Sequence, residues 1–186
     1  MLPLQFFLAK SQRINYNKMQ TVEEELIEQS VQKFEENTHK IKKCLEELSD
    51  AEVWKKPNTS SNSIGNLILH LCGNITQYII SSLGETPDHR ERDKEFSVIG
   101  GNSKEQLLDK LSSTIVQATQ VIKNLDPNSF LRIRSVQGYQ LSAVGIILHV
   151  VEHYSYHTGQ IIFWTKLLKD KDLGFYAHVD LNQKNK

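Results

Sequence analysis

The sequence predicts an all-α domain built as a four-helix bundle, and three observations support this fold class. Four long segments carry apolar residues at the three- and four-residue spacing of an amphipathic helix. No run with strand-like alternation is long enough for a substantial sheet. The chain has 186 residues, enough for one hydrophobic core, and four amphipathic helices bury their apolar faces best against one another.

The first two predicted helices are bounded by recognisable start and stop signals. One covers about residues 21–48 and begins with a capping box formed by Thr21 and Glu24. Residues 49–62, which contain Pro57 and a cluster of serine, asparagine and threonine, follow it and break the helix. The second covers about residues 63–83, where Gly84 stops it.

The third and fourth predicted helices have similar signals. The third begins at Ser103, with Gln106 three positions on, and an Asp-Pro pair ends it. The fourth covers about residues 142–168. Between them, residues 133–140 combine alternation with a glycine, so they predict either a short hairpin or an extended loop.

The connections that flank the third helix are long and bear on helix direction. They contain roughly 20 and 16 residues, enough to cross the whole bundle, whereas a short connection forces antiparallel neighbours. We therefore expect the second and third helices to run parallel, which leaves the second and fourth antiparallel.

The composition argues against two classes of partner. The chain has 22 Lys and Arg residues and 22 Asp and Glu residues, so its formal net charge at pH 7 is zero. A balanced charge gives no electrostatic reason to expect nucleic acid or an anionic membrane as a partner. The two cysteines, Cys44 and Cys72, form neither a CxxC pair nor a disulfide framework, so we expect a reducing, cytoplasmic compartment.

Residues 1–18 precede the first periodic segment. We predict that they form a flexible extension of a domain that covers residues 19–186. Residues 1–9 are mostly apolar, but this run is too short to span a bilayer and lacks the basic region of a signal peptide. The alternative is that these apolar side chains pack on the bundle or on a second subunit.

Three of the seven histidines occur at four-residue spacing in the last predicted helix: His149, His153 and His157. Four residues turn about 400°, so the three lie on nearly one face, with neighbouring Cβ atoms about 5–6 Å apart. Two neighbouring imidazoles can share one metal ion. The outer two are separated by a rise of about 12 Å and cannot both reach it with bonds of about 2 Å. The pair is therefore His149 with His153, or His153 with His157.

A third ligand is needed, and His70 in the second predicted helix is the best candidate. It lies in an apolar run, where burial of an unpaired imidazole is unfavourable. If the second and fourth helices are antiparallel, its depth along the bundle falls between His153 and His157; a parallel pair would match His149 instead. We expect a site of His70, His153 and His157. The alternative is that His70 is a hydrogen-bonded core histidine.

Three imidazoles with an open position are typical of a catalytic metal site rather than a closed structural one. Zn, Ni, Fe or Mn can use such donors, because imidazole discriminates weakly among divalent ions. Other polar residues near these histidines are candidates for holding an imidazole N–H or a substrate. They are His149, Glu152, Gln160, Asn74, Arg90 and Arg92.

Two of these assignments have an open alternative. Glu152 either holds an imidazole N–H or points to solvent. The charge-dense segment 88–96 is expected to be a solvated loop; the alternative is a lid whose Arg90 or Arg92 holds an anionic group of a substrate.

Two stretches of the sequence resemble a known family. They are SIGNLILHLCGN, which contains His70, and HVVEHYSYHTGQI, which contains His153 and His157. With Trp54 and Pro57 ahead of the second helix, they are similar to the DinB/YfiT-like superfamily of metalloenzymes, and within it to the branch called DUF1572. The likeness covers nearly the whole chain from about Met19.

The resemblance implies more than the residues alone. It implies an up-down-down-up order of helices and one divalent ion held by His70, His153 and His157. It also implies a homodimer, as in many members, and a low-molecular-weight thiol as cosubstrate or cofactor, as in some.

Two functions are compatible with these observations. The first is a metal-dependent transferase or hydrolase that acts on a small-molecule substrate, specifically a thiol S-transferase. The second is a non-enzymatic metal-binding protein or stress-response scaffold, which a sealed site without a cavity would favour.

Overall fold

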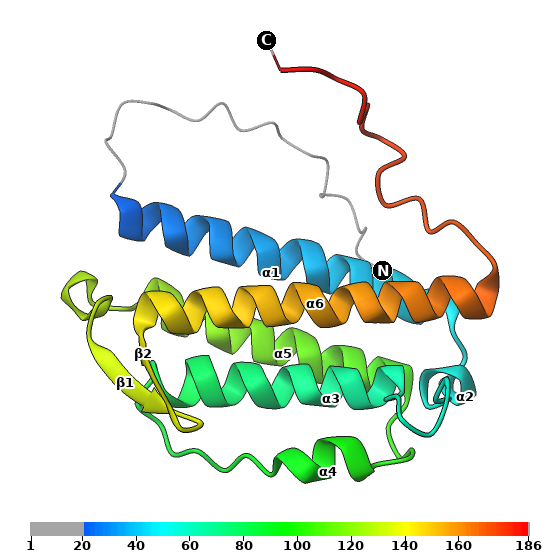
Figure 1. Ribbon diagram of the computed structural model, residues 1–186, viewed down its shortest axis with the longest axis horizontal. Coiled ribbons are helices and arrows are strands. Elements are labelled where there is room, and N and C mark those ends of the chain that lie inside the picture. Colours follow the sequence, from blue (N-terminus) through cyan, green and yellow to red (C-terminus); the bar gives the residue numbers. More distant parts are fainter. Residues whose placement is uncertain (1–20, 186) are drawn as a thin grey trace, which may run out of the picture.

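The computed structural model describes residues 21–185, which are mostly helical, so the all-α prediction is confirmed in its broad form. The predicted extension over residues 1–18 lies outside these described residues. Figure 1 shows the long helices side by side along the longest axis. The helical elements are α1 (Val22–Glu47), α2 (Asp50–Val53), α3 (Ile64–Ile75), the π-helical segment η1 (Thr76–Ser81), α4 (Arg92–Ser97), α5 (Lys104–Lys123), the 3₁₀ turn η2 (Pro127–Ser129) and α6 (Ala143–Lys169).

Side-chain caps define where these helices begin. In a capping box, the N-cap hydroxyl accepts a hydrogen bond from the N3 backbone, and the N3 side chain accepts one from the N-cap backbone. The predicted boxes at Thr21 and Ser103 are both present. Ser49 and Ser63 form two more, and Ser142 caps α6 through the backbone N–H of its third residue. Local sequence therefore fixes the register of each long helix.

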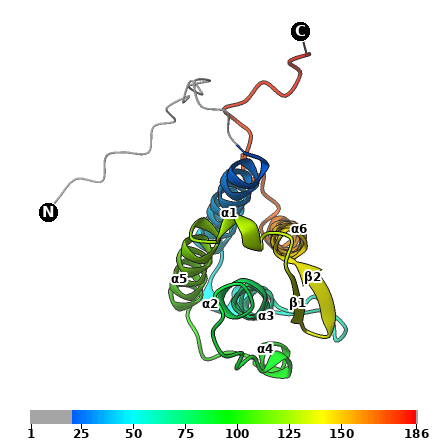
Figure 2. The same cartoon turned by 90° about the vertical axis from the view of Figure 1, so that its left-hand side faces the viewer.

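The four long helices surround a common core, as the end-on view in Figure 2 shows. Helix α1 contacts α5 and α6, and α3 contacts the same two helices from the other side. Along α1 and α6 the residue numbers rise together, because Thr38 contacts Tyr154 and Glu47 contacts Lys171 beyond the end of α6. Along α3 and α6 they run in opposite directions.

Large apolar side chains from all four long helices fill this core. Fully burying one such side chain contributes about 1.5–3 kcal/mol, so the long helices form a rigid support for the polar residues between them. Many of these side chains are completely inaccessible to solvent, among them Tyr154, Phe34, Ile41, Ile68, Leu71, Leu107 and Leu111.

Several shorter features differ from, or add to, the sequence prediction. The second predicted helix does not continue as a regular α-helix to residue 83, because its last part widens into η1. Widened turns of this kind are frequent at functional sites. The segment 88–96 is not simply a solvated loop, because its second half belongs to α4, which packs along α3 (Figure 1).

Residues 133–142 form a hairpin rather than an extended loop. Strand β1 (Ile133–Val136) pairs antiparallel with β2 (Tyr139–Ser142) through a two-residue turn. Gln137 and Gly138 both have positive φ, of 49° and 84°, as the favoured turns of two-residue hairpins require. The hydroxyl of Tyr78 in η1 donates to the side-chain oxygen of Gln137 at 2.8 Å, which ties the tip of the hairpin to the end of α3.

Within residues 21–185, none of the helices combines the length and the apolar character needed to cross a membrane.

One ion pair makes the stability of this fold depend on pH. Glu52 in α2 accepts hydrogen bonds from the backbone and hydroxyl of Ser49 and from Lys169 of α6. The backbone bond from Ser49, then the bonds from Lys169 and the Ser49 hydroxyl, lower the pKa of Glu52 from 4.5 to about 2. Because the folded-state pKa is lowered, its stabilisation is complete above pH 4.5 and is lost as the pH falls toward 2.

We predict that Glu52→Gln lowers the free energy of unfolding at pH 7. We also predict that the difference from the wild type narrows between pH 4.5 and pH 2. Urea denaturation across that range measures both effects. Glu36→Gln is the control, because Glu36 pairs with Lys33 on an exposed face, where ion pairs contribute little. An equal effect of both substitutions at pH 7 would contradict the prediction.

Candidate metal centre

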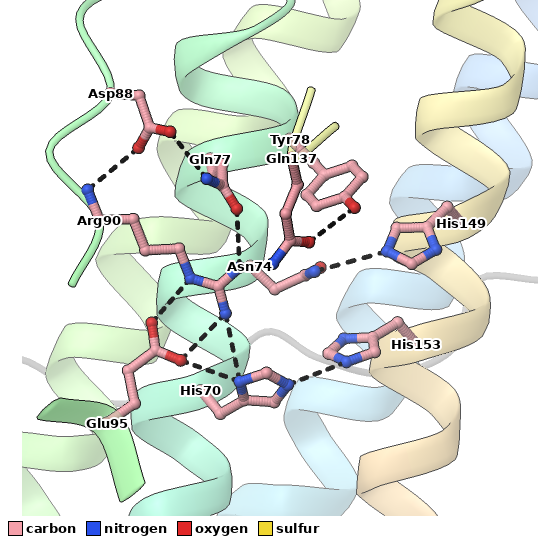
Figure 3. A network of polar contacts seen from close by, with 10 residues as sticks. All are labelled: His70, Asn74, Gln77, Tyr78, Asp88, Arg90, Glu95, Gln137, His149 and His153. Atoms are coloured by element: carbon pink, nitrogen blue, oxygen red, sulfur yellow. Dashed lines mark hydrogen bonds and ion pairs between the residues drawn. The ribbon is translucent and has the colours of Figure 1, made fainter. Parts of the chain in front are cut away.

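Three imidazole rings converge between α3 and α6. His70 comes from α3, and His153 and His157 come from successive turns of α6. The Nε2 atom of His153 lies 3.1 Å from Nε2 of His70 and 3.1 Å from Nε2 of His157. One ligand atom from each ring lies within 4.8 Å of the other two. Figure 3 shows His70 and His153 facing each other across the gap between the helices.

This spacing is compatible with a single metal ion. With metal–nitrogen bonds of about 2.0–2.1 Å, two nitrogens are about 3.4 Å apart at a tetrahedral angle and about 2.9 Å apart at a right angle. The observed 3.1 Å lies between these values. The three histidines thus form a group that could hold a metal ion. Coordination itself stays a prediction.

The outer nitrogen of His70 is held by Glu95 of α4. Its Nδ1 lies 2.9 Å from Glu95 Oε2 and 3.2 Å from Arg90 Nη2. An ionised carboxylate and a guanidinium cannot both be partners of one ring N–H, because the first only accepts and the second only donates. Because a carboxylate oxygen 2.9 Å from Nδ1 can only accept, a proton on Nδ1 is needed between them, and Nδ1 donates to Glu95. This tautomer leaves the Nε2 lone pair of His70 directed at the other histidines.

Arg90 in turn positions Glu95. Its Nε and Nη2 donate to the two carboxylate oxygens of Glu95, and its Nη1 donates to Gln77 Oε1 at 2.9 Å (Figure 3). The Arg90 side chain is only 3% exposed. Burial alone would raise the pKa of Glu95, but the hydrogen bonds from His70 and Arg90 hold it below its ordinary value. Glu95 therefore stays ionised. The prediction of a solvated loop is wrong for Arg90 and Glu95, because both pack against α3.

Gly73 of α3 makes room for this ion pair. A Cβ atom at position 73 would collide with Glu95 Oε1 and lie 3.0 Å from Arg90 Nε. The missing side chain therefore lets the carboxylate lie directly on the helix surface, within reach of His70 one turn earlier.

The two α6 histidines differ in their outer contacts. Nδ1 of His157 lies 2.8 Å from Gln160 Oε1, which can only accept, so this ring also directs its Nε2 lone pair inward. Nδ1 of His153 is buried and has no hydrogen-bond partner among the described residues. Burial, followed by the neighbouring His157 and His70, lowers the pKa of His153 from 6.5 to about 3. His153 is therefore neutral at physiological pH, as metal ligation requires.

Other predicted site residues lie beside the cluster. His149 lies one turn before His153. Its ring packs on that of Tyr78, with the ring centroids 4.4 Å apart. Its Nε2 atom is 3.4 Å from Asn74 Nδ2. Glu152 is exposed and forms no hydrogen bond with any residue between 21 and 185. The outer carboxylate of the cluster is therefore Glu95 of α4.

A cavity of about 700 Å³ adjoins the histidines. A volume of this size suits a small-molecule ligand. The histidine cluster is therefore not sealed on this side. The cavity is lined by His70, Asn74, Tyr78, Arg90, Arg92, Gln137, Tyr139, Leu141, His149 and His153.

Sequence reasoning missed several residues of the site. Glu95, Gln77, Tyr78 and Gln137 all contact it, yet none stands out in the sequence. The charge density of segment 88–96 was the one signal that pointed to Glu95, but it fits a solvated loop equally well. The remaining histidines, His39, His89 and His178, are exposed and lie apart from the cluster.

Comparison with known structures identifies the fold class. A conserved protein from Enterococcus faecalis superposes with a TM-score of 0.67 at 12% identity, covering 77% of this chain and 97% of that one. A DinB-like protein from Bacillus cereus superposes with a TM-score of 0.62 at 17% identity, covering 81% and 95%. At this level of identity the likeness shows a shared fold. No curated protein matches the chain significantly.

The chain matches the family described as "Protein of unknown function (DUF1572)" over residues 21–177. It therefore belongs to that family, which confirms the branch that the sequence predicted.

The contact between Gly73 and Glu95 gives a test of the outer carboxylate. We predict that Gly73→Ala displaces Glu95 from His70 and weakens Zn²⁺ binding about 10- to 100-fold, as loss of an outer partner typically does. The variant should still fold, because alanine favours the helix, and its thermal melting checks this. Competition with a chromophoric chelator measures the affinity.

Gly159→Ala is the matched control. Gly159 also lies in a long helix, and a Cβ atom there would meet nothing within 4 Å. Unchanged Zn²⁺ affinity in Gly73→Ala would show that Glu95 does not support the site.

Proposed function

We propose that this protein binds one divalent metal ion through His70, His153 and His157 and acts as a metal-dependent transferase or hydrolase. The convergence of the three Nε2 atoms beside a cavity carries this proposal. The outer contacts of two of the rings support it, since they direct the ring lone pairs inward before any metal arrives. The side chains present suit Zn, Ni, Fe or Mn.

A metal ion held there would supply Lewis-acid chemistry and would lower the pKa of a bound water or thiol. The residues of the chain have separate tasks. Glu95 and Arg90 orient His70, and Gln160 orients His157. Asn74, Tyr78 and His149 form a polar wall of the adjoining cavity, where a small-molecule substrate would lie.

We propose that the cosubstrate is a low-molecular-weight thiol and that the reaction is thiol S-transfer. The likeness to the DinB/YfiT-like superfamily supports this, as does the state of the chain's own cysteines. Cys44 and Cys72 are both buried, and burial raises the pKa of each thiol to about 11. Neither is a ready nucleophile, so a reactive thiol would have to come from a second molecule.

The finer fold and assembly belong to the same proposal. The helix directions given by the contacts support an up-down-down-up bundle. Several apolar side chains on one face of α6 are more than half exposed, and they support a homodimer in which this face is covered. They are Leu148, Tyr156, Phe163 and Leu167. We further propose that the protein works in the reducing cytoplasm, because both cysteines are free.

Metal content tests the proposed function. Tag-free wild-type protein purified without chelator should contain about one divalent ion per chain, and His153→Ala should lose it, because His153 lies between the other two ligands. Elemental mass spectrometry measures the content. His39→Ala, which removes an exposed histidine of α1, should keep the metal.

If neither the wild type nor the control binds Zn, Ni or Mn after reloading, the histidines are structural and the proposal is wrong. If the protein binds metal but leaves thiols and electrophiles unreacted, the thiol-transfer version of the proposal is wrong.

A further inference from the structure

The cavity beside the histidines carries an excess of positive charge. Its lining contains two cations, Arg90 and Arg92, and no acidic side chain. Glu95 behind the lining neutralises Arg90 through two hydrogen bonds. Arg92 has no ion-pair partner within the part of the chain that the structure describes. A bound divalent ion would add two further positive charges, so the cavity favours an anionic ligand.

The Phe96 ring orients the Arg92 side chain and leaves its hydrogen-bond donors available. Its guanidinium lies 4.9 Å from the centre of the Phe96 ring, and the Phe96 ring lies 4.8 Å from that of His70. Contact with an aromatic face restrains a guanidinium but leaves its N–H groups free to donate in the plane of the guanidinium. These free donors lie one aromatic ring away from the histidine cluster, where a substrate carboxylate can reach them.

Asn74 supplies a second anchor deeper in the cavity. Its side chain is only 3% exposed and lines the cavity one turn after His70. The Asn74 Nδ2 atom lies 3.4 Å from His149 Nε2, but the Oδ1 atom is buried with no hydrogen-bond partner among the described residues. A buried acceptor without a partner is unfavourable. A ligand that offers an N–H or O–H to Oδ1 would remove this penalty.

We infer that the substrate held in this cavity is a small anion that places a carboxylate or similar group on Arg92 and a hydrogen-bond donor on Asn74 Oδ1. This inference rests on the proposed function, because it concerns the same site. It separates the two arginines that the sequence could not tell apart. Arg90 positions Glu95 and His70, whereas Arg92 contacts the substrate.

A matched pair of thiols tests the charge preference. N-acetyl-L-cysteine and its neutral amide, N-acetyl-L-cysteinamide, share the thiol and the amide N–H and differ at the carboxylate. Calorimetry on the Co²⁺-loaded protein at pH 7.5 should show that the acid binds at least about ten-fold more tightly than the amide. Arg92→Gln should reduce this ratio to about two-fold or less. Lys94→Gln is the control, because it removes an exposed positive charge of α4 that does not line this cavity.

The outcomes separate this inference from the proposed function. Equal binding of acid and amide by the wild type, or a ratio that survives Arg92→Gln, overturns the inference. If both ligands then still give the sulfur-to-cobalt absorption band, the thiol function stands. If the acid is preferred through Arg92 but neither ligand gives the band, the inference stands and the thiol function fails. If neither ligand binds, both are wrong.

The contact with Asn74 has a test of its own. 3-Mercaptopropionate keeps the thiol and the carboxylate of N-acetyl-L-cysteine but has no amide N–H. Wild-type protein should prefer N-acetyl-L-cysteine over it by about ten-fold, and Asn74→Ala should remove most of that preference. A preference that Asn74→Ala leaves unchanged overturns the role of Oδ1. The thermal melting of Asn74→Ala checks that the variant is folded.

Discussion

The carboxylate of Glu95 accepts hydrogen bonds from His70 and Arg90 at the same time, and the geometry of the candidate site depends on it. Because the carboxylate only accepts, it places a proton of His70 on Nδ1, and in the neutral ring this leaves the lone pair on Nε2. The second task of Glu95 is electrostatic, since it neutralises the buried guanidinium of Arg90. An ion pair at this depth is favourable only when its remaining donors are also satisfied, and Gln77 accepts from a third Arg90 nitrogen.

This interaction also ties a short, peripheral helix to the rigid part of the fold. Helix α4 has six residues and would not be stable alone. Asn66, at the start of α3, donates to the backbone oxygens of Glu95 and Val98 at 3.0 and 2.7 Å. Gly73 provides the flat surface on which the Glu95 carboxylate lies. Packing of α3 in the core therefore sets the position of Glu95, and Glu95 sets the orientation of His70.

The sequence predicted the long helices and the histidine cluster because both depend on local spacing. Apolar periodicity and capping residues act within a few positions, and the four-residue spacing of His153 and His157 places them on one helix face whatever the tertiary fold. Placing His70 at the same depth as this face required only the relative direction of the second and fourth helices, which the connection lengths indicated. These steps needed no knowledge of how distant segments pack.

The remaining features depend on contacts between distant segments, which no local pattern encodes. Glu95 lies 25 positions beyond His70, and the Tyr78–Gln137 bond joins residues 59 positions apart. In a single sequence, a buried arginine in a charged run looks the same as a solvated one. For this reason the sequence suggested Glu152 as a carboxylate partner of an imidazole, whereas the structure places Glu95 beside His70.

The protonation state of the imidazole rings in the metal-free protein tests this account most directly. Nitrogen-15 NMR of labelled histidine distinguishes the two neutral tautomers of each ring. The account predicts that the proton of the neutral ring lies on Nδ1 in both His70 and His157, and that Glu95→Ala, which leaves no acceptor at this position, removes the preference at His70 while leaving His157 unchanged. A proton on Nε2 of His70 in the wild type would contradict it, because that lone pair would then be unable to face a metal ion.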